Sequence, residues 1–199
     1  MIIGCYNKSV IITYIGILSA IWGIANSDNP RIALAFLIIA GICDLFDGPV
    51  ARLCKSRTLE DKEFGKQIDS LADVIISIAL PVCIITRSFS IHIVYTFIIC
   101  SVYALAGVIR LAWYNITELQ NGYYTGLPVT YIALIFPVSF IILDAISFDN
   151  FQMSLIYNAM MVLMAFAFVA NIKVKKPTKV WYYIFSVLAI FTLTILIIG

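Results

Sequence analysis

The chain has 199 residues, of which 62% are hydrophobic and only 12% charged, and its mean hydropathy is +1.01. A soluble globular domain carries about 25% charged residues, so this composition excludes an ordinary water-soluble protein and indicates an integral membrane protein. The net charge of +2 gives no indication of a nucleic-acid partner.

Hydrophobic runs that are long enough to cross a membrane follow one another along the chain. A transmembrane helix needs about 20 mostly apolar residues. In chain order the predicted spans are residues 9–26, 31–53, 65–86, 91–113, 126–146, 153–171 and 180–198. The sequence therefore predicts an all-α integral membrane bundle of six or seven transmembrane helices, in a single domain over residues 1–199.

Lysine and arginine are distributed unequally between the two ends of this predicted bundle. With seven spans, only Arg31 and Arg87, of the 13 basic residues, fall at the end opposite the N-terminus. Because basic residues collect on the cytoplasmic side of membrane proteins, we expect a multi-pass protein of the cell membrane with its N-terminus in the cytoplasm.

Cysteine and histidine offer little basis for metal or nucleophilic chemistry. The five cysteines include no CxxC pair, and His92 is the only histidine. A zinc site or a histidine-based catalytic triad is therefore disfavoured.

Apart from Asp144, which lies near the far surface at the end of the fifth span, four aspartates lie inside the predicted spans: Asp44 and Asp47 in the second, and Asp69 and Asp73 in the third. A charged side chain at the centre of a transmembrane helix costs roughly 2.5–3.5 kcal/mol and is a functional residue by default. The i, i+3 and i, i+4 spacings place each pair on one helix face. Since the two spans are antiparallel, both pairs lie roughly 6–13 Å inside the same end of the bundle, and we expect them to converge.

Converging carboxylates repel one another, so such a site needs cations. Oxygen-only ligands suit Mg²⁺ or Mn²⁺. Gly48, Ala51 and Gly65 are small enough to let a ligand approach the helices closely. Arg52 offers a fork of donors that suits a phosphate, and the set together indicates a diphosphate ligand.

These residues form one ordered pattern: Asp44-x2-Asp47-Gly48-x2-Ala51-Arg52, then Gly65-x3-Asp69-x3-Asp73. The pattern resembles the signature of the CDP-alcohol phosphatidyltransferase family. Twelve residues separate Arg52 from Gly65, where the family usually has eight or nine. The extra length falls in a charged loop, where it costs little.

The resemblance implies that the four aspartates bind two divalent cations, which hold the diphosphate of a CDP-linked lipid, and that Asp73 is the general base. It also implies that Gly48, Ala51, Arg52 and Gly65 contact the nucleotide and the phosphates. The family resemblance also suggests that the protein forms a homodimer and that its other partners are membrane lipids.

Three further segments resemble the branch of the family that transfers the phosphatidyl group of CDP-diacylglycerol to L-serine. They are "EFGKQIDSLADVI" at 63–75, "RLAWYN" at 110–115 and "GLP" at 126–128. We expect Arg110, with Asn115 nearby, to hold the serine carboxylate. An arginine that only anchors the helix at the interface is an equal alternative.

Other readings remain open. Within the family, inositol phosphate or glycerol 3-phosphate are alternative acceptors, and CDP-choline or CDP-ethanolamine with diacylglycerol is an alternative donor and acceptor pair. An ion-coupled transporter is a remote alternative, because the chain has no internal repeat and its intramembrane carboxylates cluster at one depth rather than at the midplane.

Overall fold

The structure is a computed structural model that describes residues 4, 8–54, 58–117, 123–175 and 179–198. The described residues are almost entirely helical. The helices are α1 (Lys8–Ala25), α2 (Pro30–Leu53), α3 (Leu59–Asp73), α4 (Leu80–Ser88), α5 (Ile93–Ile116), α6 (Ile132–Ala145), α7 (Asn150–Val169) and α8 (Lys179–Ile198). A π-helical turn at Val74–Ala79 joins α3 to α4, and a 3-10 turn at Val129–Tyr131 leads into α6.

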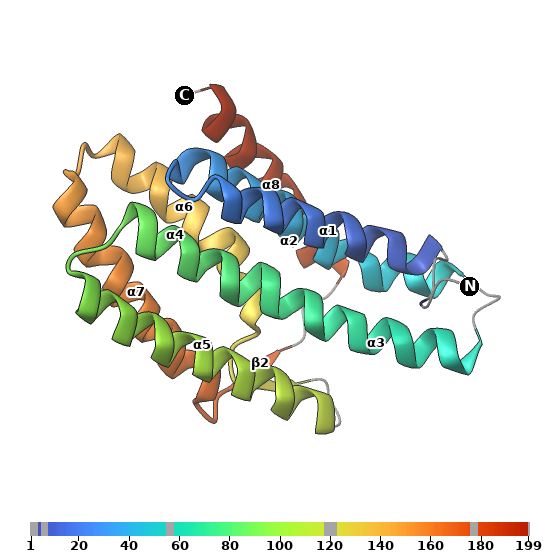
Figure 1. Ribbon diagram of the computed structural model, residues 1–199. Helices are drawn as coiled ribbons and strands as arrows, with labels where there is room; N and C mark the ends of the chain where they lie inside the picture. Colours follow the sequence, from blue (N-terminus) through green and yellow to red (C-terminus); the bar gives the residue numbers. More distant parts are fainter. Residues whose placement is uncertain (1–3, 5–7, 55–57, 118–122, 176–178, 199) are drawn as a thin grey trace.

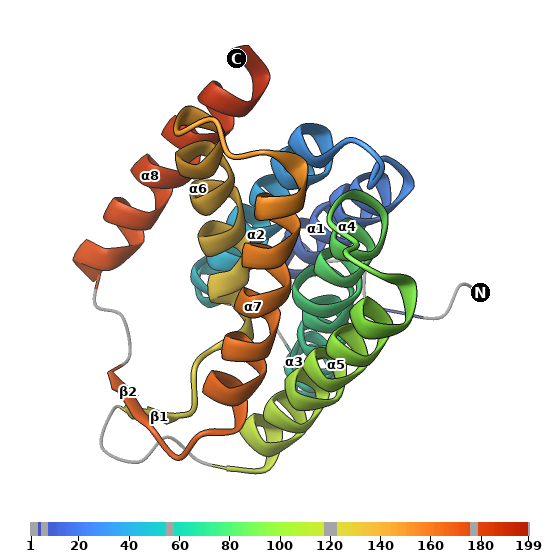
Figure 2. The same ribbon diagram turned by 90° about the vertical axis from the view of Figure 1, so that its left-hand side faces the viewer.

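Since α3, the π-helical turn and α4 form one continuous rod, the described residues form a bundle of seven rods (Figures 1 and 2). Five are at least 18 residues long and apolar enough to cross a membrane, and residues 10–25 and 129–145 form two shorter apolar helices. The prediction of an all-α integral membrane bundle is confirmed.

The rod from Leu59 to Ser88 is longer than the predicted third span. It has 30 residues and begins at Leu59 rather than at residue 65. Thr58 and Asp61 form a capping box, in which each side chain accepts a hydrogen bond from the other residue's backbone N–H. At about 1.5 Å per residue the rod is ~45 Å long, against a hydrocarbon core of about 30 Å. Its charged first turns can therefore extend beyond the membrane core.

A short two-stranded antiparallel sheet, which the sequence analysis did not anticipate, lies at the end of the bundle where α5 and α7 end. Strand β1 (Tyr123–Thr125) pairs antiparallel with β2 (Lys173–Lys175), with Tyr124 opposite Val174. Figure 2 shows the two strands beyond the ends of α5 and α7. Gly126 leaves β1 with a φ of +78°, and its N–H donates to the carbonyl of Ile172 at 2.8 Å. The sheet therefore attaches the segment that precedes α6 to the segment that follows α7.

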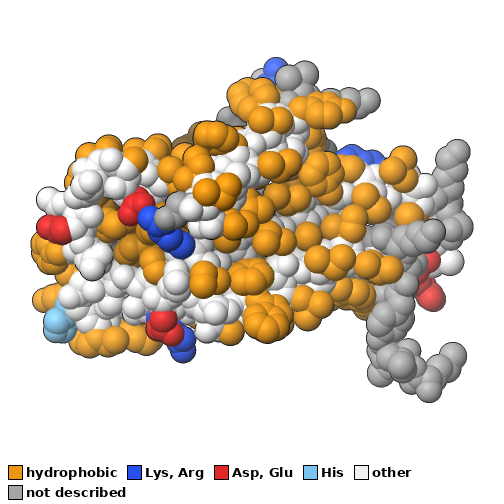
Figure 3. Space-filling view, turned by 90° about the horizontal axis from the view of Figure 1, so that it is seen from above, with side chains coloured by type: hydrophobic (Ala, Val, Ile, Leu, Met, Phe, Trp, Pro, Cys, Tyr) orange, Lys and Arg blue, Asp and Glu red, His pale blue; other side chains and the backbone are white. Residues whose placement is uncertain are grey.

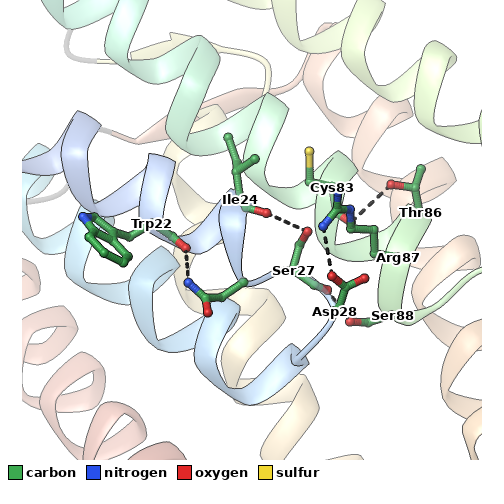
Figure 4. A network of polar contacts seen from close by, with 9 residues as sticks. Trp22, Ile24, Ser27, Asp28, Cys83, Thr86, Arg87 and Ser88 are labelled. Carbon is green, nitrogen blue, oxygen red and sulfur yellow. Dashed lines mark hydrogen bonds and ion pairs between the residues drawn. The ribbon is translucent and has the colours of Figure 1, made fainter.

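Polar contacts join the loops at the opposite end of the bundle, away from the two-stranded sheet. Arg87 pairs with Asp28 at 3.0 Å, and Ser88 Oγ donates to the carbonyl of Ser27 at 2.6 Å, so the α1–α2 loop is attached to the end of α4 (Figure 4). On the face in Figure 3, hydrophobic side chains cover the middle, and charged side chains gather at the left-hand end. This distribution fits a bundle that spans a membrane.

Helices α2 and α6 approach each other closely at Gly41. A Cβ built at Gly41 would lie 2.5 Å from the Cβ of Ala133, so no side chain fits there without separating the helices. The residues around Ala133 on α6 also form part of the cavity described below. The absence of a side chain at Gly41 therefore lets α2 and α6 lie close together where they line the cavity.

We expect Gly41→Val to destabilise the protein by about 1–3 kcal/mol, because it forces extra volume into a packed contact. Thermal unfolding in detergent measures the effect. Gly48→Ala is the control, since a Cβ at Gly48 meets no atom within 4 Å. Equal melting temperatures for the two variants would contradict the close α2–α6 approach.

Candidate metal and phosphate site

A cavity of about 770 Å³ opens at the end of the bundle where α2 ends and α3 begins. Residues of α2, α3, α5, α6 and α8 line it, with Thr13 of α1 and Tyr124 of β1. Its size lies in the usual range for small-molecule sites, about 300–1,000 Å³. The charged residues of the lining come from α2, α3 and α5, whereas α6 and α8 contribute uncharged residues.

The four intramembrane aspartates all line this cavity. Asp44, Asp47 and Asp69 each offer one carboxylate oxygen, and these oxygens lie within 4.8 Å of one another. The side chain of the fourth, Asp73, lies beside that of Asp44. Helix α1 packs against both α2 and α3 and so braces the two helices that supply the carboxylates.

This donor set fits a divalent cation. A Mg²⁺ ion binds oxygens at 2.0–2.1 Å, so it holds ligands up to about 4.2 Å apart, close to the separation of the three carboxylates. One oxygen of Asp73, Oδ1, is buried and forms no hydrogen bond with any residue that the structure describes. A buried carboxylate oxygen without a donor is costly unless a cation or ligand meets it.

Three hydrogen bonds between helices orient the surroundings of the aspartates. Thr13 Oγ1 donates to Asp47 Oδ2 at 3.2 Å, and Asp47 is only 9% exposed. On the other side, Ser70 Oγ donates to Asn115 Oδ1 at 3.0 Å, and Lys66 Nζ donates to the carbonyl of Asn115 at 3.4 Å. These contacts fix α1 to α2 and α3 to α5 at the depth of the carboxylates.

The other residues of the sequence pattern also line the cavity. They are Gly48, Ala51, Arg52 and Gly65. The open space beside Gly48 leaves room for a ligand against the α2 backbone. The Arg52 side chain is exposed and forms no ion pair or hydrogen bond within the described part of the chain. Its guanidinium is thus available to an anion that enters the cavity.

Arg110 is buried at the same end, with 6% of its surface exposed. Its Nη2 donates to the carbonyl of Gly126 at 3.5 Å, and its guanidinium lies 5.5 Å from the ring centre of Tyr114. Its Nε is buried without a partner among the described residues. A Cβ at Gly126 would lie 3.1 Å from that Nε, so glycine lets the backbone approach the arginine.

Sequence reasoning missed several cavity residues. Thr13 lies on a different helix from Asp47, and nothing in its surrounding sequence marks it. Four tyrosines also line the cavity: Tyr114, Tyr124, Tyr131 and Tyr182. Burial, with Tyr114 and Tyr182 nearby, raises the pKa of Tyr124 to about 12, so its hydroxyl stays protonated and able to donate. The sequence feature that could have indicated these tyrosines is the enrichment of tyrosine after residue 102.

The fold and the cavity together define an integral membrane protein with an oxygen-only, acidic site at one end of a helical bundle. The chain belongs to the CDP-alcohol phosphatidyltransferase family, whose sequence profile matches residues 7–198.

Three curated relatives illustrate the similarity. A CDP-diacylglycerol–serine O-phosphatidyltransferase of Saccharomyces cerevisiae is 34% identical over 58% of this chain and 44% of its own length. A protein of the same name from Methanocaldococcus jannaschii is 30% identical over 87% of this chain and 78% of its own length. An archaetidylserine synthase of Methanothermobacter thermautotrophicus is 32% identical over 61% of this chain and 49% of its own length. The alignment thus spans about half the length of two of these relatives and most of the third.

We expect Thr13→Val to weaken Mn²⁺ binding about ten-fold, because Asp47 loses the donor that orients its carboxylate. Titration of the purified protein with Mn²⁺, followed by electron paramagnetic resonance, measures this. Thr13→Ser keeps the hydroxyl and should retain the original affinity. Equal affinities for Thr13→Val and the unsubstituted protein would show that the hydrogen bond does not orient a ligand.

Proposed function

We propose that this protein transfers the phosphatidyl group of CDP-diacylglycerol to the hydroxyl of L-serine, giving phosphatidylserine and CMP. The observation that carries the proposal is the convergence of three carboxylates from α2 and α3 in one cavity, with Asp73 beside them. Family membership and the names of the relatives support the same reaction class.

The depth of the cavity suits a donor that is half lipid and half nucleotide. Asp69 lies ten residues after the start of the rod at Leu59, or about 15 Å along a rod whose charged first turns can leave the membrane core. The diphosphate would thus lie near the headgroup level, with the acyl chains in the bilayer. In this proposal the cavity opens on the cytoplasmic side of the cell membrane, as the positive-inside distribution of Lys and Arg suggests.

The residues of the sequence pattern would hold the donor. Asp44, Asp47, Asp69 and Asp73 are the proposed ligands of two divalent cations, Mg²⁺ or Mn²⁺. When bound, such ions neutralise the diphosphate and stabilise the attacking and leaving oxygens of an in-line displacement. Arg52 would contact a phosphate, while Gly48, Ala51 and Gly65 leave space for the nucleotide and the diphosphate.

Asp73 is the proposed general base. Its Oδ1 is buried and has no hydrogen-bond partner among the described residues, so it can accept the proton of the serine hydroxyl. The serine oxygen would then form a bond to the phosphorus of the diacylglycerol phosphate, and the bond from that phosphorus to the CMP oxygen would break. CMP leaves with the electron pair of the broken bond.

Arg110 is the proposed partner of the serine carboxylate, with Asn115 beside it. The arginine lines the cavity and has an unpaired Nε, and Asn115 is held by Ser70 and Lys66. A fixed guanidinium suits a carboxylate because it can donate two parallel hydrogen bonds. A homodimer in the membrane is part of the proposal on the basis of family resemblance alone.

Purified protein in vesicles that contain CDP-diacylglycerol, with Mn²⁺ or Mg²⁺, tests the reaction. Labelled serine should yield labelled phosphatidylserine and one CMP for each product molecule. Parallel assays offer inositol phosphate and glycerol 3-phosphate as acceptors, and CDP-choline or CDP-ethanolamine with diacylglycerol. Turnover only with one of these other substrates would contradict the serine assignment and keep the family reaction.

We expect Asp69→Asn to lower turnover by at least about a hundred-fold, since it removes a charged cation ligand. Asp144→Asn is the matched control. Asp144 pairs with Arg31 at 2.7 Å at the opposite end of the bundle, and this partly exposed pair should contribute little. Retained turnover in Asp69→Asn would remove the aspartates from the proposed mechanism.

We expect Arg110→Lys to raise the KM for serine about ten-fold and to leave kcat within about two-fold, because lysine keeps the charge and loses the paired donors. Steady-state kinetics with serine as the varied substrate separate the two constants. Arg87→Lys, at the far end, serves as the control. An unchanged KM for serine would leave Arg110 as an interfacial anchor.

A further inference from the structure

The rod that carries Asp69 and Asp73 changes its helical geometry directly after Asp73. Val74–Ala79 forms a π-helical turn, and Leu80 N–H donates to the carbonyl of Ile75, five residues earlier. Such turns are rare and occur often at functional sites. Here the turn separates the half of the rod that bears the carboxylates from the half that packs in the core.

Pro81 explains why the α-helix is interrupted there. In an α-helix the N–H of residue 81 would donate to the carbonyl of Ser77, four residues earlier. Proline has no N–H, and its ring collides with that carbonyl. The wider π-helical turn relieves the collision but leaves the carbonyl of Ser77 without its α-helical donor.

Tyr103 of α5 supplies a replacement. Its hydroxyl donates to the carbonyl of Ser77 at 2.6 Å, and both residues are 0% exposed. One turn further along α5, a Cβ at Gly107 would lie 2.8 Å from Ile78 Cδ1, so α5 packs tightly on the π-helical turn. The Tyr103 hydroxyl therefore lies where the free carbonyl needs a donor.

The π-helical turn determines which way the carboxylates point. One residue corresponds to roughly 100° of rotation in a helix, so a turn with an extra residue offsets the faces on its two sides by about that angle. Leu80, Ile84 and Ile85 of α4 are fully buried, so their half of the rod is fixed in the core. A change in the turn would therefore rotate Asp69 and Asp73 away from Asp44 and Asp47.

We propose that Tyr103 is a positioning residue for the acidic site. By holding the carbonyl that Pro81 leaves free, it stabilises the π-helical turn and keeps Asp69 and Asp73 directed at the α2 carboxylates. This inference rests on the proposed role of the aspartates as cation ligands. It does not depend on which acceptor the enzyme uses.

Two tyrosines of the chain allow a matched comparison. Tyr157 is also 0% exposed, and its hydroxyl donates to a helix carbonyl, that of Phe136, at 2.9 Å. It stacks on Phe89 near the far end of α4, away from the aspartates. Tyr103→Phe and Tyr157→Phe each remove one buried hydroxyl that donates to a helix carbonyl. At Phe136 the Ser139 hydroxyl still donates, at 2.8 Å, so Tyr157→Phe controls for the loss of a buried tyrosine hydroxyl as such.

The test measures Mn²⁺ binding to the purified protein in lipid nanodiscs by electron paramagnetic resonance, without lipid substrate or serine. We expect Tyr103→Phe to weaken Mn²⁺ binding about five-fold, the worth of about one hydrogen bond, and Tyr157→Phe to leave it unchanged. An equal loss in both variants, or no loss in Tyr103→Phe, would overturn the proposal. Absence of serine transfer by a protein that binds Mn²⁺ would count against the proposed function only.

Pro81→Ala provides a second test that does not weaken the fold. Alanine restores the N–H for Ser77 and favours a continuous α-helix, so the melting temperature should stay the same or rise. The proposal requires weaker Mn²⁺ binding in this more stable variant, because the carboxylates rotate. Unchanged Mn²⁺ affinity with unchanged or higher stability would contradict it.

Discussion

The structure depends on one electrostatic constraint, the placing of four carboxylates inside a bundle of apolar helices. Each of these groups is costly at membrane depth when it is alone. Together they repel, unless cations lie between them. The helices therefore have to bring the carboxylates close enough to share ions, and the arrangement of α1, α2 and α3 does this. All four carboxylates line the cavity at this end of the bundle.

The rest of the bundle keeps that arrangement fixed while the site stays accessible. At the far end, ion pairs and the contact between Ser27 and Ser88 join the loops. In the middle, Gly41 lets α2 pack against α6, and in our proposal the π-helical turn holds α3 in its rotation. At the site end, the two-stranded sheet places Gly126 against Arg110. These contacts hold the bundle together at both ends and in the middle, and the cavity is the place where a substrate can enter.

Much of this arrangement could be predicted from the sequence, because hydrophobic length and the spacing of acids are local signals. The i, i+3 and i, i+4 aspartates specify a shared depth once two antiparallel spans are assumed, and the structure places all four in one cavity. Other features depend on contacts between distant segments. The hydrogen bond from Thr13 to Asp47 joins residues that are 34 positions apart in the sequence, and the hydrogen bond from Tyr103 to Ser77 joins residues that are 26 positions apart. Pro81 could have indicated an irregular helix, but the donor that replaces its N–H lies on another helix.

The most direct test of the account is an experimental structure of the protein with Mn²⁺ and CDP-diacylglycerol, in which anomalous scattering locates the metal. The account predicts Mn²⁺ peaks between α2 and α3, within bonding distance of carboxylate oxygens of Asp44, Asp47 and Asp69 and beside the donor's diphosphate. A diphosphate bound elsewhere, or a cavity whose aspartates hold no Mn²⁺ while the lipid is bound, would contradict it.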